Sequence, residues 1–213
     1  MPQPVVMFDF GNVLGFFDYG LIFRRFGARL GMDGDAFREL VLARGLEALL
    51  MDFEAGAIEP GAFAARVGKA VGLDVPFSEF VADWEDIFEL NAPVAAIAAD
   101  LKGRGHSLVL GSNTNAIHAA FYRRKFQEAL AVFDRFVLSH EVKAMKPDRA
   151  FFQACLDVAG APAAECVFID DVALNVRGAR AAGLRAIHYR DPAGLVAELR
   201  RLGIATSAVD SGN

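Results

Sequence analysis

Four polar groups in this chain follow short apolar runs, and their residue types could bind a divalent cation and a phosphate group. They are a single carboxylate, a serine and asparagine pair, a lysine and a pair of carboxylates: Asp9, Ser112 and Asn113, Lys146, and Asp170 and Asp171. Carboxylates packed together repel one another unless a cation lies between them. Carboxylate and carbonyl oxygens are the ligands that Mg²⁺ prefers, and water and substrate phosphate take its other positions. These residues therefore predict a magnesium-bound phosphate site.

Each of these groups would have a role in phosphoryl transfer. Asp9 could act as a nucleophile and form an aspartyl-phosphate that water later hydrolyses. Mg²⁺ and Lys146 would neutralise the charge on the equatorial phosphate oxygens, while the Ser112 hydroxyl and backbone N–H groups orient them. On its own, Asp9 could equally begin a turn, because Asp-x-Gly-Asn is also a turn sequence. The recurrence of polar groups after apolar runs favours the catalytic interpretation.

The apolar runs before these groups are typical of strands buried on both faces of a parallel sheet. Such runs lie at residues 5–8, 107–111, 136–138, 166–169 and 184–188, with helical patterns between them. Strands that alternate with helices predict βαβ units with right-handed crossovers, and hence an α/β fold. Ligands of these sheets bind beyond the carboxyl ends of the strands, which is where the polar groups lie.

A long helical segment separates the first two predicted strands. Residues 15–91 carry apolar residues at helical spacing in four stretches, and Gly31, Pro60 and Gly72 mark ends or starts of helices. Roughly 75 residues of helix is longer than an ordinary crossover. We therefore expect a four-helix cap over residues 15–91, inserted into a catalytic core of residues 1–14 and 92–213.

The composition is that of a globular protein. Hydrophobic residues make up 54% of the 213 residues, yet no apolar run reaches the roughly 18 residues that a membrane helix needs. Pro2-Gln3-Pro4 leaves no room for the basic start of a signal peptide, so we expect a cytoplasmic protein without a membrane partner. The net charge of −5 argues against nucleic acid as a partner. Cys155 and Cys166 lack metal-ligand spacing and are expected to be reduced core thiols, and the oligomeric state stays open.

The motifs resemble those of the haloacid dehalogenase superfamily of phosphatases, over residues 5 to about 203. The resemblance is carried by Asp9-Phe10-Gly11-Asn12-Val13-Leu14, Ser112-Asn113-Thr114-Asn115, Lys146-Pro147-Asp148 and Phe168-Ile169-Asp170-Asp171 with Asn175. It implies a Rossmann-like parallel sheet core with an inserted helical cap. It also implies a Mg²⁺-dependent phosphoric monoester hydrolase that acts on a small phosphorylated metabolite. The chain is most similar to bacterial α-D-glucose-1-phosphate phosphatases, so a sugar phosphate, such as a sugar 1-phosphate, is the expected substrate.

The resemblance also implies a role for each residue of the motifs. Asp9 is expected to be both the nucleophile and a metal ligand, with the Gly11 carbonyl and Asp171 as further ligands. Asp170 is expected to act on the metal through a bound water or to hold Lys146. The residues expected to bind the phosphate are Gly11, Asn12, Ser112, Asn113 and Lys146.

One position departs from the family pattern. Most of the family's phosphatases carry a second aspartate two residues after the nucleophile, which protonates the leaving group and then activates water, and here that position is Gly11. Either the leaving group needs less help, as an anomeric hydroxyl would, or another acid substitutes. Asp18 is the nearest candidate in the sequence and Glu54, in the cap loop, is a weaker one. For both, a solvated or capping role is the simpler expectation.

Other functions fit parts of the pattern. A metal-independent 2-haloacid dehalogenase would use the same aspartate to displace halide. Without a metal ion, however, Asp170 and Asp171 would add negative charge beside a nucleophile that is already anionic. The acidic pair therefore favours a phosphatase. A catalytically weak phosphate-binding or regulatory protein is consistent with the loss of the acid at Gly11. A further interpretation is the phosphatase-like domain that accompanies some epoxide hydrolases, whose hydrolase half the chain is too short to include.

Overall fold

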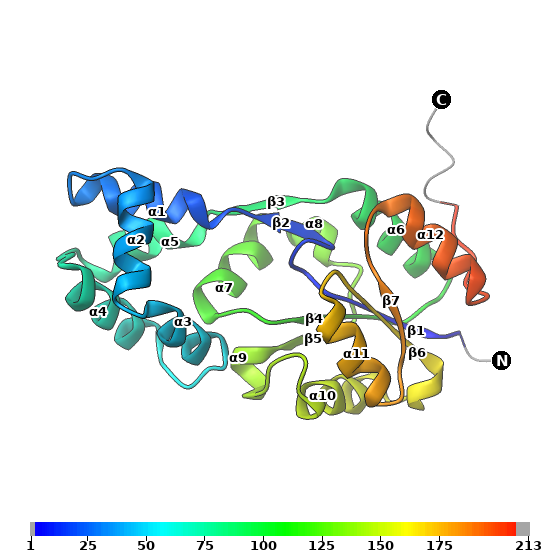
Figure 1. Ribbon diagram of the computed structural model, residues 1–213. Helices are drawn as coiled ribbons and strands as arrows, with labels where there is room; N and C mark the ends of the chain where they lie inside the picture. Colours follow the sequence, from blue (N-terminus) through cyan, green and yellow to red (C-terminus); the bar gives the residue numbers. More distant parts are fainter. Residues whose placement is uncertain (1–2, 208–213) are drawn as a thin grey trace.

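The computed structural model describes residues 3–207, and its centre is a parallel sheet with helices on both faces (Figure 1). Within this part of the chain the sheet has five strands in the order β5-β4-β1-β6-β7. Their bounds are β1 Val5–Phe8, β4 Leu108–Ser112, β5 Arg135–Leu138, β6 Cys166–Asp170 and β7 Arg185–His188. All neighbouring strands are parallel. The predicted α/β fold is therefore confirmed.

β1 lies in the centre of the sheet and is buried on both faces. Val6 and Phe8 belong to the hydrophobic core on one face, while Val5 and Met7 belong to the core on the other. Side chains alternate along a strand, so a strand covered on both faces is apolar at every position. The chain passes from β1 to β4 and β5 on one side, and later to β6 and β7 on the other. Ligands of open α/β sheets bind where the strand order changes direction in this way.

Helices form one layer on each face of the sheet. The first layer contains α6 (Ala92–Gly103), α7 (Ala116–Lys125) and α12 (Pro192–Arg201), and the second contains α10 (Arg149–Ala159) and α11 (Ala173–Ala181). Two short helices, α8 (Gln127–Leu130) and α9 (Ser139–Val142), and a 3₁₀ turn at Ala163–Glu165 lie in the connections. Cys155 and Cys166 are free and buried in the second layer, as expected. None of the helices within residues 3–207 has the length and hydrophobicity that a membrane crossing needs.

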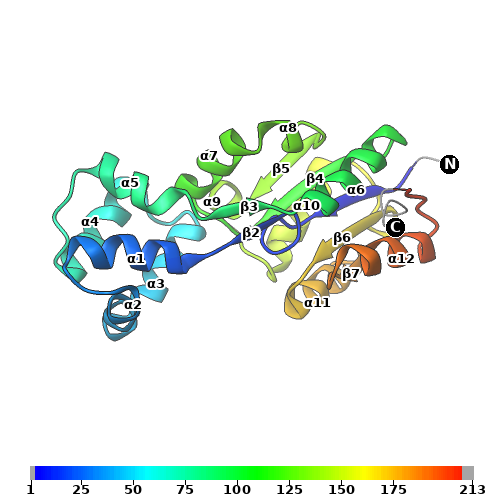
Figure 2. The same ribbon diagram turned by 90° about the horizontal axis from the view of Figure 1, so that it is seen from above.

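Between β1 and β4 the chain leaves the sheet and forms a mostly helical segment, residues 15–91, which we call the cap. It extends from the end of the sheet where the strands finish (Figures 1 and 2). Its elements are β2 Gly15–Phe17, α1 Tyr19–Arg29, α2 Gly34–Ala43, α3 Leu46–Glu54, α4 Pro60–Val71, α5 Phe77–Glu85 and β3 Phe88–Leu90. β2 and β3 pair antiparallel, so the chain enters and leaves the cap through one ribbon. The division into a core and a separate cap domain stays a prediction.

The predicted number of four cap helices is wrong, because the structure has five. The apolar stretch over residues 37–51 breaks at Gly45, whose φ of +63° is a left-handed conformation that glycine adopts at low cost. The last helix of the cap ends at Glu85, and Phe88 pairs with Phe17 in the ribbon. Strands of three residues are too short for their periodicity to be recognised in a sequence.

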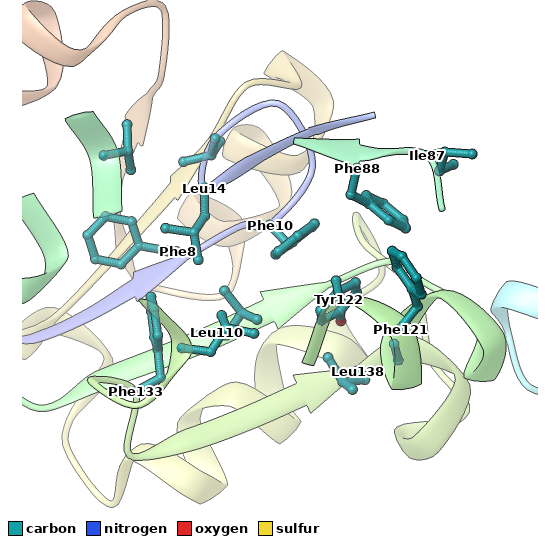
Figure 3. Packing of buried hydrophobic residues seen from close by; sticks show 14 of the residues in the cluster. Phe8, Phe10, Leu14, Ile87, Phe88, Leu110, Phe121, Tyr122, Phe133 and Leu138 are labelled. Atoms are coloured by element: carbon teal, nitrogen blue, oxygen red, sulfur yellow. The ribbon is translucent and has the colours of Figure 1, made fainter. Parts of the chain in front are cut away.

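An aromatic cluster joins the end of β1 to the ribbon of the cap (Figure 3). Phe10 stacks on Tyr122 of α7 with ring centroids 4.1 Å apart, and it meets Phe88 of β3 edge-on at 5.6 Å. A side chain at residue 15 would prevent this packing, because a Cβ there would lie 2.7 Å from the Phe10 ring. The cluster anchors the residue that directly follows Asp9.

Candidate active site

The carboxylates and the lysine predicted from the sequence meet at the carboxyl ends of β1 and β6. The Nζ atom of Lys146 lies 2.7 Å from Oδ1 of Asp9 and 2.7 Å from Oδ2 of Asp170. Asp9, Asp170 and Asp171 each place a carboxylate oxygen within 4.8 Å of the other two. Lys146 and Asp170 are fully or almost fully buried. Residues 161 positions apart in the chain are therefore brought together by two neighbouring parallel strands.

Asp9 is held firmly in this cluster. Its Oδ1 atom accepts a hydrogen bond of 2.7 Å from the backbone N–H of Phe10 as well as the contact from Lys146. Burial raises the pKa of Asp9 to about 7, the positive charge of Lys146 opposes this rise, and the carboxylates Asp170 and Asp171 add to it. One lysine thus balances only part of the negative charge, and a divalent cation would balance the rest.

The two carboxylates of the pair have different environments. Asp170 is fully buried, and its oxygens accept hydrogen bonds from Lys146 Nζ, from the Val172 N–H at 2.8 Å and from Asn175 Nδ2 at 3.0 Å. Asp171 lines a cavity of about 350 Å³ together with Asp9. Of the two roles expected for Asp170, holding Lys146 is the one that its contacts match. Asp171 is the member of the pair that faces the cavity.

The donors of this cluster are suited to magnesium. They are all carboxylate oxygens, which are hard ligands, and they lie close enough together to share one ion. Asp9 and Asp171 could hold the ion from the cavity. The Gly11 carbonyl, the other expected ligand, belongs to a residue that lines the same cavity.

Asn113 positions Lys146 through its side chain. Its Oδ1 accepts a hydrogen bond of 2.8 Å from the Lys146 N–H, and its Nδ2 donates one of 3.0 Å to the Lys146 carbonyl. A contact from Asn113 to a phosphate would therefore come from its main chain. Ser112, the last residue of β4, is buried, and its hydroxyl donates only a long hydrogen bond of 3.3 Å to the Asn113 carbonyl. Both residues line the cavity.

Gly11 and Asn12 form a tight turn at the edge of the cavity. The Asn12 N–H donates to the Gly15 carbonyl at 2.7 Å, and Asn12 adopts a left-handed φ of 54°. Its side-chain Nδ2 donates to Oδ2 of Asp171 at 3.3 Å. A Cβ at residue 11 would approach the Phe17 ring to 3.1 Å. The turn therefore links the first motif to the acidic pair, and a side chain at residue 11 would require the partly exposed Phe17 ring to shift by a few tenths of an ångström.

The cap completes the cavity with a mostly apolar wall. The cap residues that line it are Phe17, Tyr19, Leu50, Glu54, Ile87 and Phe88. Glu54, the last residue of α3, is partly buried, and its Oε1 accepts a hydrogen bond of 3.3 Å from the Tyr19 hydroxyl. Burial raises the pKa of Glu54, and the hydrogen bond from Tyr19 opposes this rise. The solvated or capping role expected for Glu54 is therefore wrong, because the residue is partly buried, bonds the Tyr19 hydroxyl and lines the cavity.

Asp18, the other candidate acid, lies outside the residues that line this cavity. Its Oδ1 accepts a hydrogen bond of 2.7 Å from the Gly20 N–H and so caps α1, and its Oδ2 pairs with Arg24 at 3.2 Å. The side chain is 59% exposed. The capping role expected for Asp18 is confirmed.

His118, on α7, lines the cavity as a neutral side chain. Its Nε2 donates to the Trp84 carbonyl at 3.1 Å, because a carbonyl can only accept, and its Nδ1 accepts from Asn115 Nδ2 at 3.0 Å. Burial lowers the pKa of His118 to about 4. The ring also stacks on Trp84 of α5 with centroids 5.5 Å apart. His118 therefore links α7 of the core to α5 of the cap.

Comparison with known protein families adds the decisive observation. Residues 5–183 match the haloacid dehalogenase-like hydrolases. The chain belongs to this family. Among solved structures, the haloacid dehalogenase (HAD) family enzyme bt-2542 from Bacteroides thetaiotaomicron is similar with a TM-score of 0.75 and 23% identity, over 89% of this chain and 95% of that one. A structure of that enzyme in complex with magnesium and inorganic phosphate gives a TM-score of 0.72 and 24% identity, over 88% and 94% of the two chains. At these identities the likeness shows the haloacid dehalogenase-like fold alone.

Two characterised relatives are similar in sequence. The sesquiterpene phosphatase astK of Aspergillus oryzae is 30% identical over 154 residues, which are 70% of this chain and 76% of that protein. Bifunctional epoxide hydrolase 2 of Rattus norvegicus is 28% identical over 144 residues, which are 64% of this chain but only 26% of that protein. The haloacid dehalogenase-like chain thus spans most of the first relative and about a quarter of the second.

Proposed function

We propose that this chain is a Mg²⁺-dependent phosphoric monoester hydrolase that acts on a small phosphorylated metabolite through an aspartyl-phosphate. The main support for this proposal is the buried lysine Lys146, which lies 2.7 Å from both Asp9 and Asp170, with Asp171 beside them. This arrangement supports the proposal, because it brings three carboxylates and a lysine together at one cavity, where Asp9 could act as the nucleophile and the carboxylate oxygens could bind a metal ion. The relative that is a sesquiterpene phosphatase, and the enzyme that binds magnesium and inorganic phosphate, agree with this proposal.

Asp9 is the proposed nucleophile. The Phe10 N–H and Lys146 both donate to its Oδ1, and these contacts fix the orientation of the carboxylate toward the cavity. Asp9, Asp171 and the Gly11 carbonyl would hold the magnesium ion. When bound, Mg²⁺ would neutralise negative charge that gathers on the phosphate oxygens.

Lys146 and Ser112 are the proposed side-chain donors to the phosphate. Lys146 supplies a full positive charge, and its position is fixed by Asp170 and by the backbone clamp from Asn113. The Ser112 hydroxyl can rotate away from its long hydrogen bond toward an oxygen of the phosphate. The backbone N–H groups of Gly11 and Asn113 and the side-chain amide of Asn12 would complete the set. We also propose that residues 15–91 act as a cap that excludes water from the reaction.

A sugar 1-phosphate is one proposed substrate. It fits the resemblance to α-D-glucose-1-phosphate phosphatases, and an anomeric hydroxyl leaves more readily than an ordinary alcohol. The apolar wall that the cap contributes favours a second class, an ester with an apolar alcohol. An apolar hollow of about 280 Å³ in the cap shares Tyr19 and Leu50 with the catalytic cavity. The sesquiterpene phosphatase among the relatives supports this second class.

A phosphate-release assay tests the proposed function. The purified protein is assayed with and without Mg²⁺ on p-nitrophenyl phosphate, acetyl phosphate, sugar 1- and 6-phosphates and isoprenoid monophosphates. We expect release that depends on Mg²⁺ and is abolished by Asp9→Asn. Equal inactivity with and without Mg²⁺ would refute the hydrolase and favour a phosphate-binding protein. Halide release from 2-chloropropionate without metal would instead establish the dehalogenase alternative.

A further inference from the structure

The catalytic cavity needs a proton donor that the first motif does not supply. An alkoxide is a poor leaving group, and general acid catalysis of its departure contributes about 100- to 10,000-fold to the rate. Residue 11 is a glycine in a tight turn, and Asp18, the nearest acid, caps α1 in solvent. For the ester of an ordinary alcohol, the donor would therefore be another residue that lines the cavity.

The titratable residues that line the cavity are Asp9, Tyr19, Glu54, His118, Tyr122, Lys146 and Asp171. Most of them already have a partner or a proposed role. Asp9 is the proposed nucleophile, Asp171 a proposed metal ligand, and Lys146 is paired with two carboxylates. His118 uses both ring nitrogens within the protein, and burial raises the pKa of both tyrosines well above their usual range. Among the described residues that line the cavity, Glu54 is therefore the acid that remains for this role.

Glu54 is fixed at the contact between cap and core. Its carbonyl accepts a hydrogen bond of 2.6 Å from the Ser139 hydroxyl of α9. Two residues later, the Gly56 carbonyl accepts a hydrogen bond from Lys143, and a Cβ at Gly56 would lie only 2.1 Å from the His140 carbonyl. The loop that carries Glu54 therefore docks closely on α9. This docking sets the position of the carboxyl group relative to the strand ends.

Groups around Glu54 leave its carboxyl group without a counter-ion. Tyr19 of α1 donates the hydrogen bond to it. The ionisable residues of the adjoining α9 segment have other partners: His140 contacts the Thr114 carbonyl, Glu141 contacts Arg123, and Lys143 binds the Gly56 carbonyl. No ion pair from a residue within 3–207 reaches Glu54. A carboxyl group that is partly buried without a counter-ion retains its proton to higher pH than a solvated one.

We propose that Glu54 is the general acid of the first half-reaction and the general base of the second. This role rests on the proposed phosphatase function. In an in-line displacement the ester oxygen lies on the far side of phosphorus from the nucleophile. Asp9 and Lys146 come from the ends of the sheet, so the ester oxygen points toward the wall that the cap supplies. Glu54 is the acid of that wall.

The two half-reactions balance with these groups. A carboxylate oxygen of Asp9 attacks phosphorus, the bond between phosphorus and the ester oxygen breaks, and Glu54 gives its proton to that oxygen, so the alcohol leaves. The Glu54 carboxylate then takes a proton from water, whose oxygen attacks phosphorus. The bond between phosphorus and Asp9 breaks, which restores the Asp9 carboxylate and releases inorganic phosphate. Glu54 is again protonated for the next turnover.

Glu54→Gln tests this role, because the amide keeps the volume and an acceptor for Tyr19 but has no proton to give at neutral pH. With p-nitrophenyl phosphate, nitrophenolate leaves without a proton. We expect the variant to release one equivalent of nitrophenolate per enzyme at the wild-type rate, followed by a steady state slowed about 100-fold or more. With an alkyl phosphate that wild type hydrolyses, release of the alcohol itself should be slowed by this factor. Glu54→Asp, which keeps an acid, should recover part of this loss.

Asp52→Asn is the matched control, because Asp52 lies on the same helix, is exposed and is not among the residues that line the catalytic cavity or the apolar hollow. It should leave both rates unchanged. A Glu54→Gln variant that slows nitrophenolate release and alcohol release equally, or neither of them, would overturn the proposed role. If wild type released phosphate from no ester, the proposed function itself would fail. The two failures are therefore distinguishable.

Discussion

Acid should destabilise this protein through His118, whose neutral ring joins α7 of the core to Trp84 of the cap. The pKa of His118 falls from its usual 6.5 to about 4 because the ring is buried. The unfolded chain therefore binds a proton at higher pH than the folded protein does. The free energy of unfolding that His118 contributes is fully present above pH 6.5, and it declines as the pH falls toward 4.

The size of this loss follows from the two pKa values. The separation between 6.5 and about 4 corresponds to about 3 kcal/mol once the pH lies below both. At pH 5, where the unfolded chain is protonated and the folded protein is mostly not, the loss is about 2 kcal/mol. A single domain is stable by only about 5–15 kcal/mol, so this loss is measurable.

Urea unfolding at pH 7.5, 6 and 5 measures the effect. Trp84 is the single tryptophan of the chain and stacks on His118, so its fluorescence reports on this contact directly. The comparison is between wild type and His118→Gln, whose amide can still donate to the Trp84 carbonyl but does not titrate. Wild type should lose about 2 kcal/mol more than the variant between pH 7.5 and 5. The same pH dependence in both proteins would refute a neutral, buried His118.

Three further substitutions distinguish catalytic residues from structural ones. Lys146→Met leaves Asp9 and Asp170 buried without their shared cation, so metal-free protein should lose about 3–5 kcal/mol in urea unfolding and all phosphate release. Unchanged stability would contradict the bridging role of the lysine. Asp18→Ala removes the cap of α1 and should lower the free energy of unfolding by about 1 kcal/mol with kcat unchanged, whereas a large loss of kcat would reveal a catalytic role. Gly56→Ala places a Cβ 2.1 Å from the His140 carbonyl, so the loop must move, and kcat should fall about tenfold or more in steady-state assays; a wild-type kcat would show that the loop position is unimportant.

The sheet and the strand-end residues could be predicted because both depend on local sequence. A central strand is covered on both faces, so residues such as Val6 and Met7 are all apolar. The apolar run ends at the carboxyl end of the strand, where the polar residues of the site begin. Parallel strands place their carboxyl ends at one edge, so Asp9 and Lys146 could be expected near each other without knowledge of the helix packing. Their separation of 2.7 Å agrees with this expectation.

The cap could not be predicted to the same depth, because its geometry depends on contacts between distant segments. The break at Gly45 and the short ribbon are set by how five helices fit together. The position of Glu54 could not be predicted for the same reason. Its position in the cavity depends on hydrogen bonds to α9, such as that from Ser139, which lies 85 residues away. The type and spacing of the residues near Glu54 carry no signal of this docking.

The hydrogen bonds of the acidic pair separate two neighbouring residues of the same type. Asp170 is the last residue of β6, and Asp171 follows it in a bend, with a carboxylate oxygen within 4.8 Å of one of Asp170. The two therefore differ in their partners, and Asp171 is the one that lines the cavity. The hydrogen bonds to Asp170 from Lys146, Val172 and Asn175 occupy both of its oxygens, whereas Asp171 lies beside Asn12 at the cavity wall. The lysine that neutralises Asp9 is thus fixed by a carboxylate that is itself saturated, which leaves Asp171 available for a metal ion.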